Sequence, residues 1–172
     1  MMRKVIFFIM IYAIYSCADK KSEPSKMDLL SQDTLKISKA DIEKLNFTEF
    51  VLDPSSDKKL AGWLKYRELE DRINELKNAD LSFFKGDKKI VETLIEEFIS
   101  TVPSNIDEES IQARILIVET MYLKFNNKVN LTTSSKSDIQ KSITDLLEAF
   151  TNLNYQINKK FERDSQNVIK PQ

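Results

Sequence analysis

The chain of 172 residues contains no histidine, only two glycines, one cysteine and one tryptophan. Without histidine it cannot build a Ser-His-Asp or Cys-His nucleophile system, an ordinary zinc site or the Glu-x-x-His pairs of di-iron bundles. Gly62 and Gly86 lie 24 positions apart, which excludes a phosphate-cradling loop and a dinucleotide-binding fingerprint. We therefore expect no catalytic residues of these classes, no cofactor and no bound metal.

The chain also lacks an excess of charge of either sign, because 26 basic and 27 acidic side chains leave a net charge of −1. The two signs alternate along the chain and form no basic patch, so we expect no nucleic-acid partner. Acidic residues are plentiful, and hydrolysis by two carboxylates remains a formal alternative. Such chemistry needs a concave pocket, which a slim helical bundle rarely supplies. We expect that the protein is not an enzyme.

The N-terminus has the three parts of a secretory signal: basic Arg3 and Lys4, an apolar stretch over residues 5–15, and the small residue Ser16. The apolar stretch has 11 residues, whereas a helix that spans a bilayer core needs about 20. The sequence therefore predicts a signal peptide over residues 1–16 that is removed after use, rather than a transmembrane helix.

The only cysteine, Cys17, follows this stretch directly. Ile14, Tyr15, Ser16 and Cys17 resemble the lipobox of bacterial lipoproteins, in which signal peptidase cuts before a lipid-modified cysteine. The resemblance implies cleavage between Ser16 and Cys17 and a membrane anchor on Cys17. The alternative is an ordinary secretory signal followed by a free thiol. An unpaired thiol in an oxidising compartment is prone to mispairing, which favours lipidation.

The residues after the cysteine bear on the membrane that holds the anchor. In lipoproteins of enteric bacteria an aspartate directly after the cysteine retains the protein at the inner membrane, but here Ala18 precedes Asp19. The resemblance therefore implies the outer membrane, facing the periplasm. Ser16 and the composition rich in Lys, Asp, Asn and Ile are similar to small lipoproteins of the Bacteroidota, including flavobacteria. Charged residues after the cysteine can direct such chains to the cell surface, which is the alternative location, and the resemblance implies no activity.

The composition of the mature chain changes along its length and indicates four segments. We expect a lipidated N-terminus with a flexible tether over residues 17–37, a short helix and packing arm over 38–56, a four-helix bundle over 57–164, and a disordered tail over 165–172. Ser38 and Asp41 form a predicted capping box for the short helix. The arm is too apolar for a free linker, with Phe47, Phe50, Val51 and Leu52.

Apolar residues recur at a 4,3 spacing in the bundle region, as in helices that pack side by side. We expect a first helix over 57–84, ended by Gly86 in a left-handed conformation, and a second helix over 88–102, capped by Asp87. The second should bury Ile90, Val91, Leu94, Ile95, Phe98 and Ile99.

The third predicted helix is capped by Asp107, has Glu108 and Glu109 in its first turn and ends at Asn126 and Asn127. Its residues 111–125 are apolar nearly all round, so we expect it to be the most enclosed. The fourth, after a loop over 128–135, has a stripe made of Ile139, Ile143, Leu146, Phe150, Leu153 and Ile157. Four amphipathic helices with short connections predict an all-α, up-and-down four-helix bundle. The first and fourth helices should be longer than the middle pair, and any uncovered overhang is a candidate partner surface.

Two groups of residues are functional candidates. Trp63, Phe83 and Phe84 are candidate partner contacts, because interfaces favour large aromatic side chains; core packing is the alternative, which the stripe spacing favours. Arg114, Asn154 and Gln156 are polar residues among apolar ones and are candidates for a buried polar network. A salt bridge or a solvated edge is the alternative for this second group.

These features favour a non-enzymatic envelope lipoprotein. We expect it to be held on a membrane through Cys17 and to act by contact with an unknown protein partner, as an adaptor, an assembly factor or a subunit. The alternative is a ligand-binding or sensory helical bundle, with a small molecule between the third and fourth helices.

Overall fold

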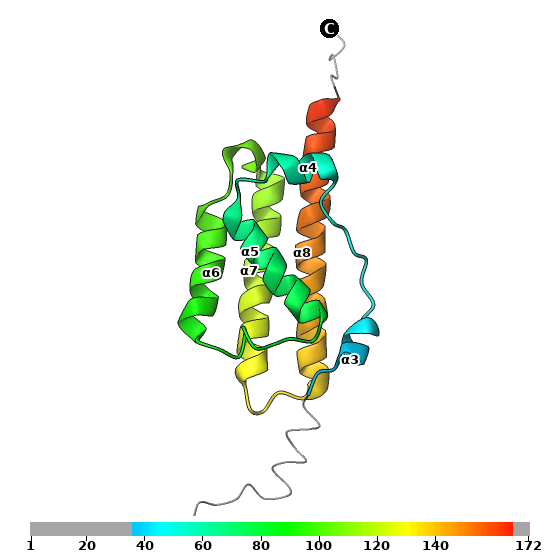
Figure 1. The fold of residues 1–172 in the computed structure, drawn as a ribbon, viewed down its shortest axis with the longest axis vertical. Helices are drawn as coiled ribbons and strands as arrows, with labels where there is room; N and C mark the ends of the chain where they lie inside the picture. Colours follow the sequence, from blue (N-terminus) through cyan, green and yellow to red (C-terminus); the bar gives the residue numbers. More distant parts are fainter. Residues whose placement is uncertain (1–35, 167–172) are drawn as a thin grey trace, which may run out of the picture. The chain divides into compact units, whose positions relative to one another are not determined.

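A computed structural model describes residues 36–166 of the chain. This part is all helical and contains no strand (Figure 1). The helices in chain order are α3 (Lys39–Glu43), α4 (Pro54–Lys59), α5 (Leu64–Lys77), α6 (Lys88–Ser100), α7 (Glu109–Asn130) and α8 (Lys136–Ser165), with a short 3₁₀ turn, η2 (Ser104–Ile106), before α7. The predicted all-α bundle is confirmed.

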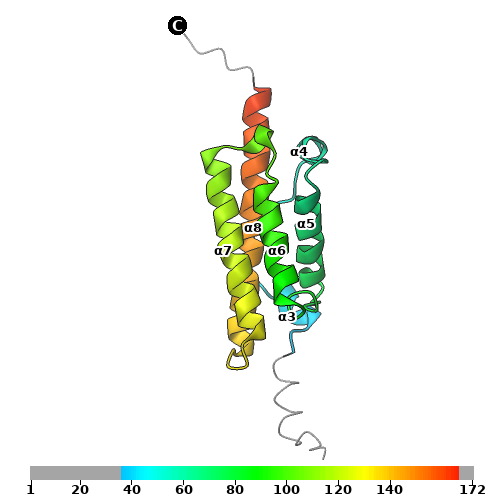
Figure 2. The ribbon, with the colours of Figure 1, turned by 90° about the vertical axis from the view of Figure 1, so that its left-hand side faces the viewer.

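Helices α5, α6, α7 and α8 run alternately in opposite directions, with α5 crossing the others obliquely (Figure 1). Seen from the side, α7 and α5 lie at opposite margins of the bundle, with α6 and α8 between them (Figure 2). Helices α7 and α8 have the most extensive pairing in this part of the chain. The fourth predicted stripe is buried along α8, as expected from its spacing.

Aromatic side chains fill the core at two levels. Trp63 stacks on Phe98 with ring centroids 4.8 Å apart, and Tyr66 stacks on Phe150 at 5.6 Å. At the other level Phe84 contacts Tyr122 and Phe125 edge to face. Each of these rings buries a large apolar area, so the core is held by contacts between segments far apart in sequence.

The predicted capping box of the first short helix is confirmed. The Ser38 hydroxyl accepts a hydrogen bond from the Asp41 amide at 3.3 Å, and the Ser38 amide donates to the Asp41 carboxylate at 2.8 Å. Asp41 also pairs with Lys136 of α8 at 2.7 Å. The hydrogen bonds from Lys136 and Ser38 hold the pKa of Asp41 below its usual value. Together these contacts fix α3 to the beginning of α8.

The first predicted bundle helix is wrong in its extent. The structure breaks residues 57–84 into α4, a turn around Gly62, α5, and a connection that begins at Asn78. Gly62 lies at the surface, since a Cβ there would meet nothing within 4 Å. Glycine has a low helix propensity, and the chain turns where it stands. Helix α4 packs on α8 near the end that was expected to overhang.

Helix α5 ends in a Schellman motif built on an alanine. Ala79 has φ of 63°. The Asp80 amide donates to the Glu75 carbonyl at 3.0 Å, and the Ala79 amide donates to the Leu76 carbonyl at 2.9 Å. The predicted left-handed glycine at Gly86 is wrong, because no glycine in the described residues has a positive φ.

Replacing Ala79 by glycine should therefore stabilise the fold by about 0.5 to 1 kcal/mol. A left-handed conformation costs an L-residue roughly 1 to 2 kcal/mol, which glycine avoids. Glycine also makes the unfolded chain more flexible, which reduces the gain by about 0.4 to 1 kcal/mol. Urea unfolding followed by circular dichroism measures the change. The matched control is Ala40→Gly in the exposed helical backbone of α3, which should lose up to about 1 kcal/mol. Equal losses at both positions would contradict the prediction.

Helix α7 also differs from its prediction. It begins at Glu109, with Glu108 rather than Asp107 at the cap, and continues beyond Asn126 to Asn130. Asn126 continues the helix because it lies on the buried face. One turn later, the side-chain amide of Asn130 donates hydrogen bonds to the backbone carbonyls of Asn126 and Phe84. The expected enclosure of α7 is wrong, since Leu116 is 61% exposed. Ile90 of α6, expected in the core, is also 61% exposed.

Candidate contact surface and arm network

The predicted lipidation and cleavage residues, Cys17 and Ser16, lie outside the described residues. No helix within residues 36–166 combines the length and the apolar character that crossing a membrane requires. Over the same range, no three His, Cys, Asp or Glu side chains are grouped closely enough to hold a metal ion. Two features of the described part are candidate sites, a polar network and a helix surface.

The three aromatic candidates for partner contact belong to the core or its edge. Trp63 and Phe84 are each 1% exposed, which corrects the partner-contact prediction for both. The indole N–H of Trp63 donates to Thr101 Oγ1 at 3.2 Å, so its polar atom is satisfied inside the bundle. Phe83 is half-buried against the core, with the Arg72 guanidinium 4.9 Å from its ring centroid.

The predicted polar network exists around Asn154 but with other members. Arg114 is exposed on α7 and takes no part in it, which corrects that prediction. Gln156 donates to Ser110 Oγ at 3.1 Å, joining α8 to α7 apart from the network. Asn154 itself is 3% exposed.

Asn154 satisfies both ends of its amide within the protein. Its Oδ1 accepts from the hydroxyl of Tyr66 at 2.8 Å, and its Nδ2 donates to the carbonyl of Phe50 at 3.1 Å. Burial raises the pKa of Tyr66 far above its ordinary value, so the hydroxyl keeps its proton and remains the donor. The amide thus links α5, α8 and the extended segment over residues 44–53, called the arm below.

The arm runs along α8 and forms hydrogen bonds with its side chains as an extended strand would with a neighbour. Phe50 donates its amide to Thr151 Oγ1. Asn158 donates to the Val51 carbonyl at 2.8 Å and accepts from the Asp53 amide at 2.9 Å. The arm covers a cavity of about 160 Å³ between α5 and α8, and its Glu49 pairs with Lys77 of α5. The arm therefore belongs to the bundle.

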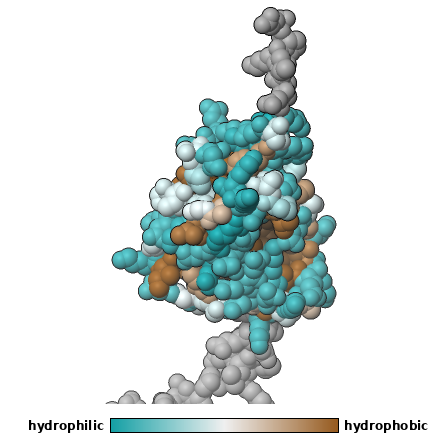
Figure 3. Space-filling model, turned by 45° about the horizontal axis from the view of Figure 1, so that its top comes forward, coloured by the Kyte–Doolittle hydropathy of each residue, from teal (hydrophilic) through white to brown (hydrophobic). Residues whose placement is uncertain are grey.

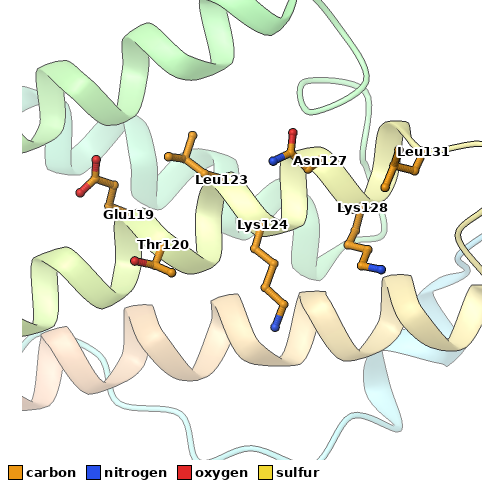
Figure 4. A pocket seen from close by; sticks show the side chains of 7 residues that line it. All are labelled: Glu119, Thr120, Leu123, Lys124, Asn127, Lys128 and Leu131. Carbon is orange, nitrogen blue, oxygen red and sulfur yellow. The ribbon is translucent and has the colours of Figure 1, made fainter.

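A second set of apolar residues lies on the outer face of α7. Figure 3 shows, for one face of the molecule, that apolar side chains occur as patches separated by hydrophilic surface. On α7 the exposed or half-exposed positions follow a 3,4,3,4 spacing, which we call the outer stripe: Ala113, Leu116, Thr120, Leu123 and Asn127. Ile117 and Leu131 flank it and are exposed as well. A shallow groove of about 580 Å³ follows the C-terminal half of the stripe (Figure 4).

Charged side chains border the outer stripe with opposite signs on its two edges. Glu119 points towards the α6 side, and Lys124 and Lys128 point towards the α8 side (Figure 4). Lys124 pairs with Asp145 at 2.7 Å, and Asp145 also pairs with Lys141 at 3.0 Å. Glu119 has no ion-pair partner among the residues that the structure describes. The stripe thus has an acidic edge and a basic edge.

The outer stripe was missed at the level of sequence. Its signal was present, because apolar residues that surround a helix fit either a fully enclosed helix or a helix with two packing stripes. The stripe of Ile111, Ile115, Val118, Tyr122 and Phe125 faces the core, and the outer stripe lies on the other side. Comparisons with protein-family models, with curated proteins and with solved structures find no match to this chain.

Proposed function

We propose that this protein is a lipid-anchored lipoprotein of the cell envelope that acts by protein contact, through the outer stripe of α7, as an adaptor, an assembly factor or a subunit. The anchor is Cys17, in the outer membrane facing the periplasm, with the cell surface as the alternative. The proposal assigns the protein no catalytic reaction.

The exposed apolar face of α7 is the observation that carries this proposal. An apolar stripe that remains exposed on a folded helix, bordered by charges, is typical of a surface that pairs with another helix. Leu116 and Leu131 each leave more than half of their surface in contact with solvent. Covering them would remove apolar area from water at about 25 cal/mol per Å².

The alternative, a ligand-binding or sensory bundle, has less support. Small-molecule sites are typically clefts of about 300 to 1,000 Å³ that enclose most of the ligand. The cavity under the arm has a volume of about 160 Å³. The larger groove along α7 is shallow and open along one helix, which suits a partner helix better than a small molecule.

Cys17→Ser tests the anchor. The variant should incorporate no labelled fatty acid and should accumulate as the uncut precursor, because the diacylglycerol-bearing sulfur is what the peptidase of this pathway requires. Metabolic labelling and the mass of the purified chain measure both effects. Normal labelling and processing of the variant would contradict lipidation at Cys17.

A photoreactive amino acid at Leu116 tests the contact surface in intact cells. Illumination should give a discrete adduct of defined mass, because this position is the most exposed leucine of the outer stripe. The control is the same amino acid at Leu64 of α5, which is 72% exposed but belongs to no stripe. Adducts from Leu64 that match those from Leu116, or none from either, would contradict a specific contact on α7.

A further inference from the structure

The outer stripe has the residue pattern of one strand of a two-stranded parallel coiled coil. With Ala113, Thr120 and Asn127 at the a positions, Leu116 and Leu123 fall at the d positions. Leucine at d together with a β-branched residue at a, here Thr120, favours pairs of helices, and one asparagine at an a position specifies register, because it pairs with the same residue on its partner. Helix α7 is already folded within the bundle, so pairing carries no cost of helix formation.

The charges decide the direction of pairing. When two identical helices pair in parallel, the two-fold axis is parallel to them, and each edge of one stripe meets the opposite edge of the other. Glu119 at a g position then lies beside the partner's Lys124, at the e position five residues later, and the symmetry forms this pair twice. An antiparallel pair would bring equal edges together and, in the register that sets Ala113 opposite Asn127, would place Glu119 beside its own copy, which is unfavourable.

We propose that the partner of the outer stripe is a second copy of this chain, bound in parallel through α7 in a two-fold homodimer. This inference rests on the proposed use of the outer stripe as a contact surface. Helix α7 lies at one margin of the bundle, where a second bundle can approach it (Figure 2). Lys124 can bind both carboxylates because an ammonium group has three donors, and Asp145 keeps Lys141 as a second cation.

A parallel pair is also compatible with two anchors in one membrane. The described chain begins at residue 36, at the end of the bundle where α7 meets α8 (Figure 1). In a parallel dimer both copies present this end on the same side. An antiparallel dimer would place the two ends on opposite sides of the assembly.

Disulfide cross-linking in membranes of cells that express the full chain tests both the partner and the direction. Ala113→Cys and Asn127→Cys, each alone, should give a homodimer on oxidation, because parallel pairing brings every stripe residue next to its own copy. These two positions are about 21 Å apart along the helix, so in an antiparallel pair only a mixture of the two variants would cross-link. The parent chain and Ile90→Cys, exposed on α6, are controls that should form no cross-linked dimer on oxidation.

Each outcome of these cross-linking experiments either supports or overturns the homodimer. Self-cross-links at both positions support the homodimer, and cross-links only in the mixture overturn it. An absence of self-cross-links, with the photoreactive Leu116 variant bound to a different protein, overturns the second copy but leaves the proposed contact function intact. No adduct at any of these positions overturns both.

Charge reversal provides an independent test on the purified full chain in detergent. Glu119→Lys and Lys124→Glu should each shift the protein to monomer in sedimentation velocity, because each makes both edges equal in sign. An equimolar mixture of the two should recover the dimer, since opposite edges are then complementary again. Thermal unfolding of each variant checks that the fold is retained. A mixture that remains monomeric, or single variants that remain dimeric, would overturn the parallel arrangement.

Discussion

Phe84→Ala should lower the free energy of unfolding by about 3 to 5 kcal/mol, the range typical of deleting a fully buried phenylalanine ring. Phe84 lies in the connection between α5 and α6 and is 1% exposed. Its ring contacts Tyr122 at 5.3 Å and Phe125 at 4.7 Å between centroids. Removing it leaves a cavity between this connection and α7 that the surrounding side chains can fill only in part. Urea denaturation followed by circular dichroism measures the loss.

Phe83→Ala is the matched control for this prediction. Phe83 precedes Phe84 and is the same residue type, but it is half-buried and covered by the flexible side chain of Arg72. Phe83→Ala should lower the free energy of unfolding by about 1 kcal/mol, the usual size for a residue whose environment can adjust. Similar losses for the two variants would show that Phe84 is not the residue that joins the connection to the core.

Asn154→Ala should cost about 1 to 3 kcal/mol, because the buried Tyr66 hydroxyl loses its shorter hydrogen bond and keeps only the one to Glu70 at 3.4 Å. The Tyr66 hydroxyl loses the acceptor at 2.8 Å, and the Phe50 carbonyl loses one of its two donors. The arm should loosen from α8 as a result. Amide hydrogen exchange should therefore become faster at Phe50 and Asp53 than in the parent protein, with little change in α7.

Asn152→Ala is the control for Asn154. Asn152 lies on the same helix two positions earlier and is exposed. Its replacement should change the stability by less than about 0.5 kcal/mol. If Asn154→Ala and Asn152→Ala were equally mild, or if exchange in the arm were unchanged, the amide would not be what holds the arm.

Local signals in the sequence predicted local structure well. The capping box at Ser38 and Asp41 and the N-cap at Asp87 both form, because each depends on residues within one helical turn. The stripe of α8 is buried along its length, because a 4,3 spacing places those side chains on one face.

Breaks in the helices were missed because apolar spacing can continue across a turn. Leu60, Trp63 and Tyr66 keep the spacing of a single stripe and are all buried, although a turn separates α4 from α5. The end of α5 was missed because residue propensity favours glycine in the left-handed region, whereas the tertiary structure holds Ala79 there.

The candidate site was predictable only in part. Asn154 was singled out correctly as a buried polar residue, but its partners are the Tyr66 hydroxyl and the backbone carbonyl of Phe50, which lies more than 100 positions earlier. A backbone carbonyl is common to every residue and leaves no trace in the sequence. Arg114 was misplaced because it is adjacent to the buried Ile115 but one helical step away from the core face.

The arrangement of α3 and the arm has a mechanical consequence. From residue 36 onwards the chain is fastened to α8 at two separate places, first where Lys136 holds Asp41 and then where Thr151, Asn154 and Asn158 hold the arm. A pulling force applied on the N-terminal side of residue 36 would reach α8 before it reached α5. The force would pass into α8, which is held together by its own backbone hydrogen bonds. Both attachments of the N-terminal segment to α8 would have to break before the force reached the rest of the core.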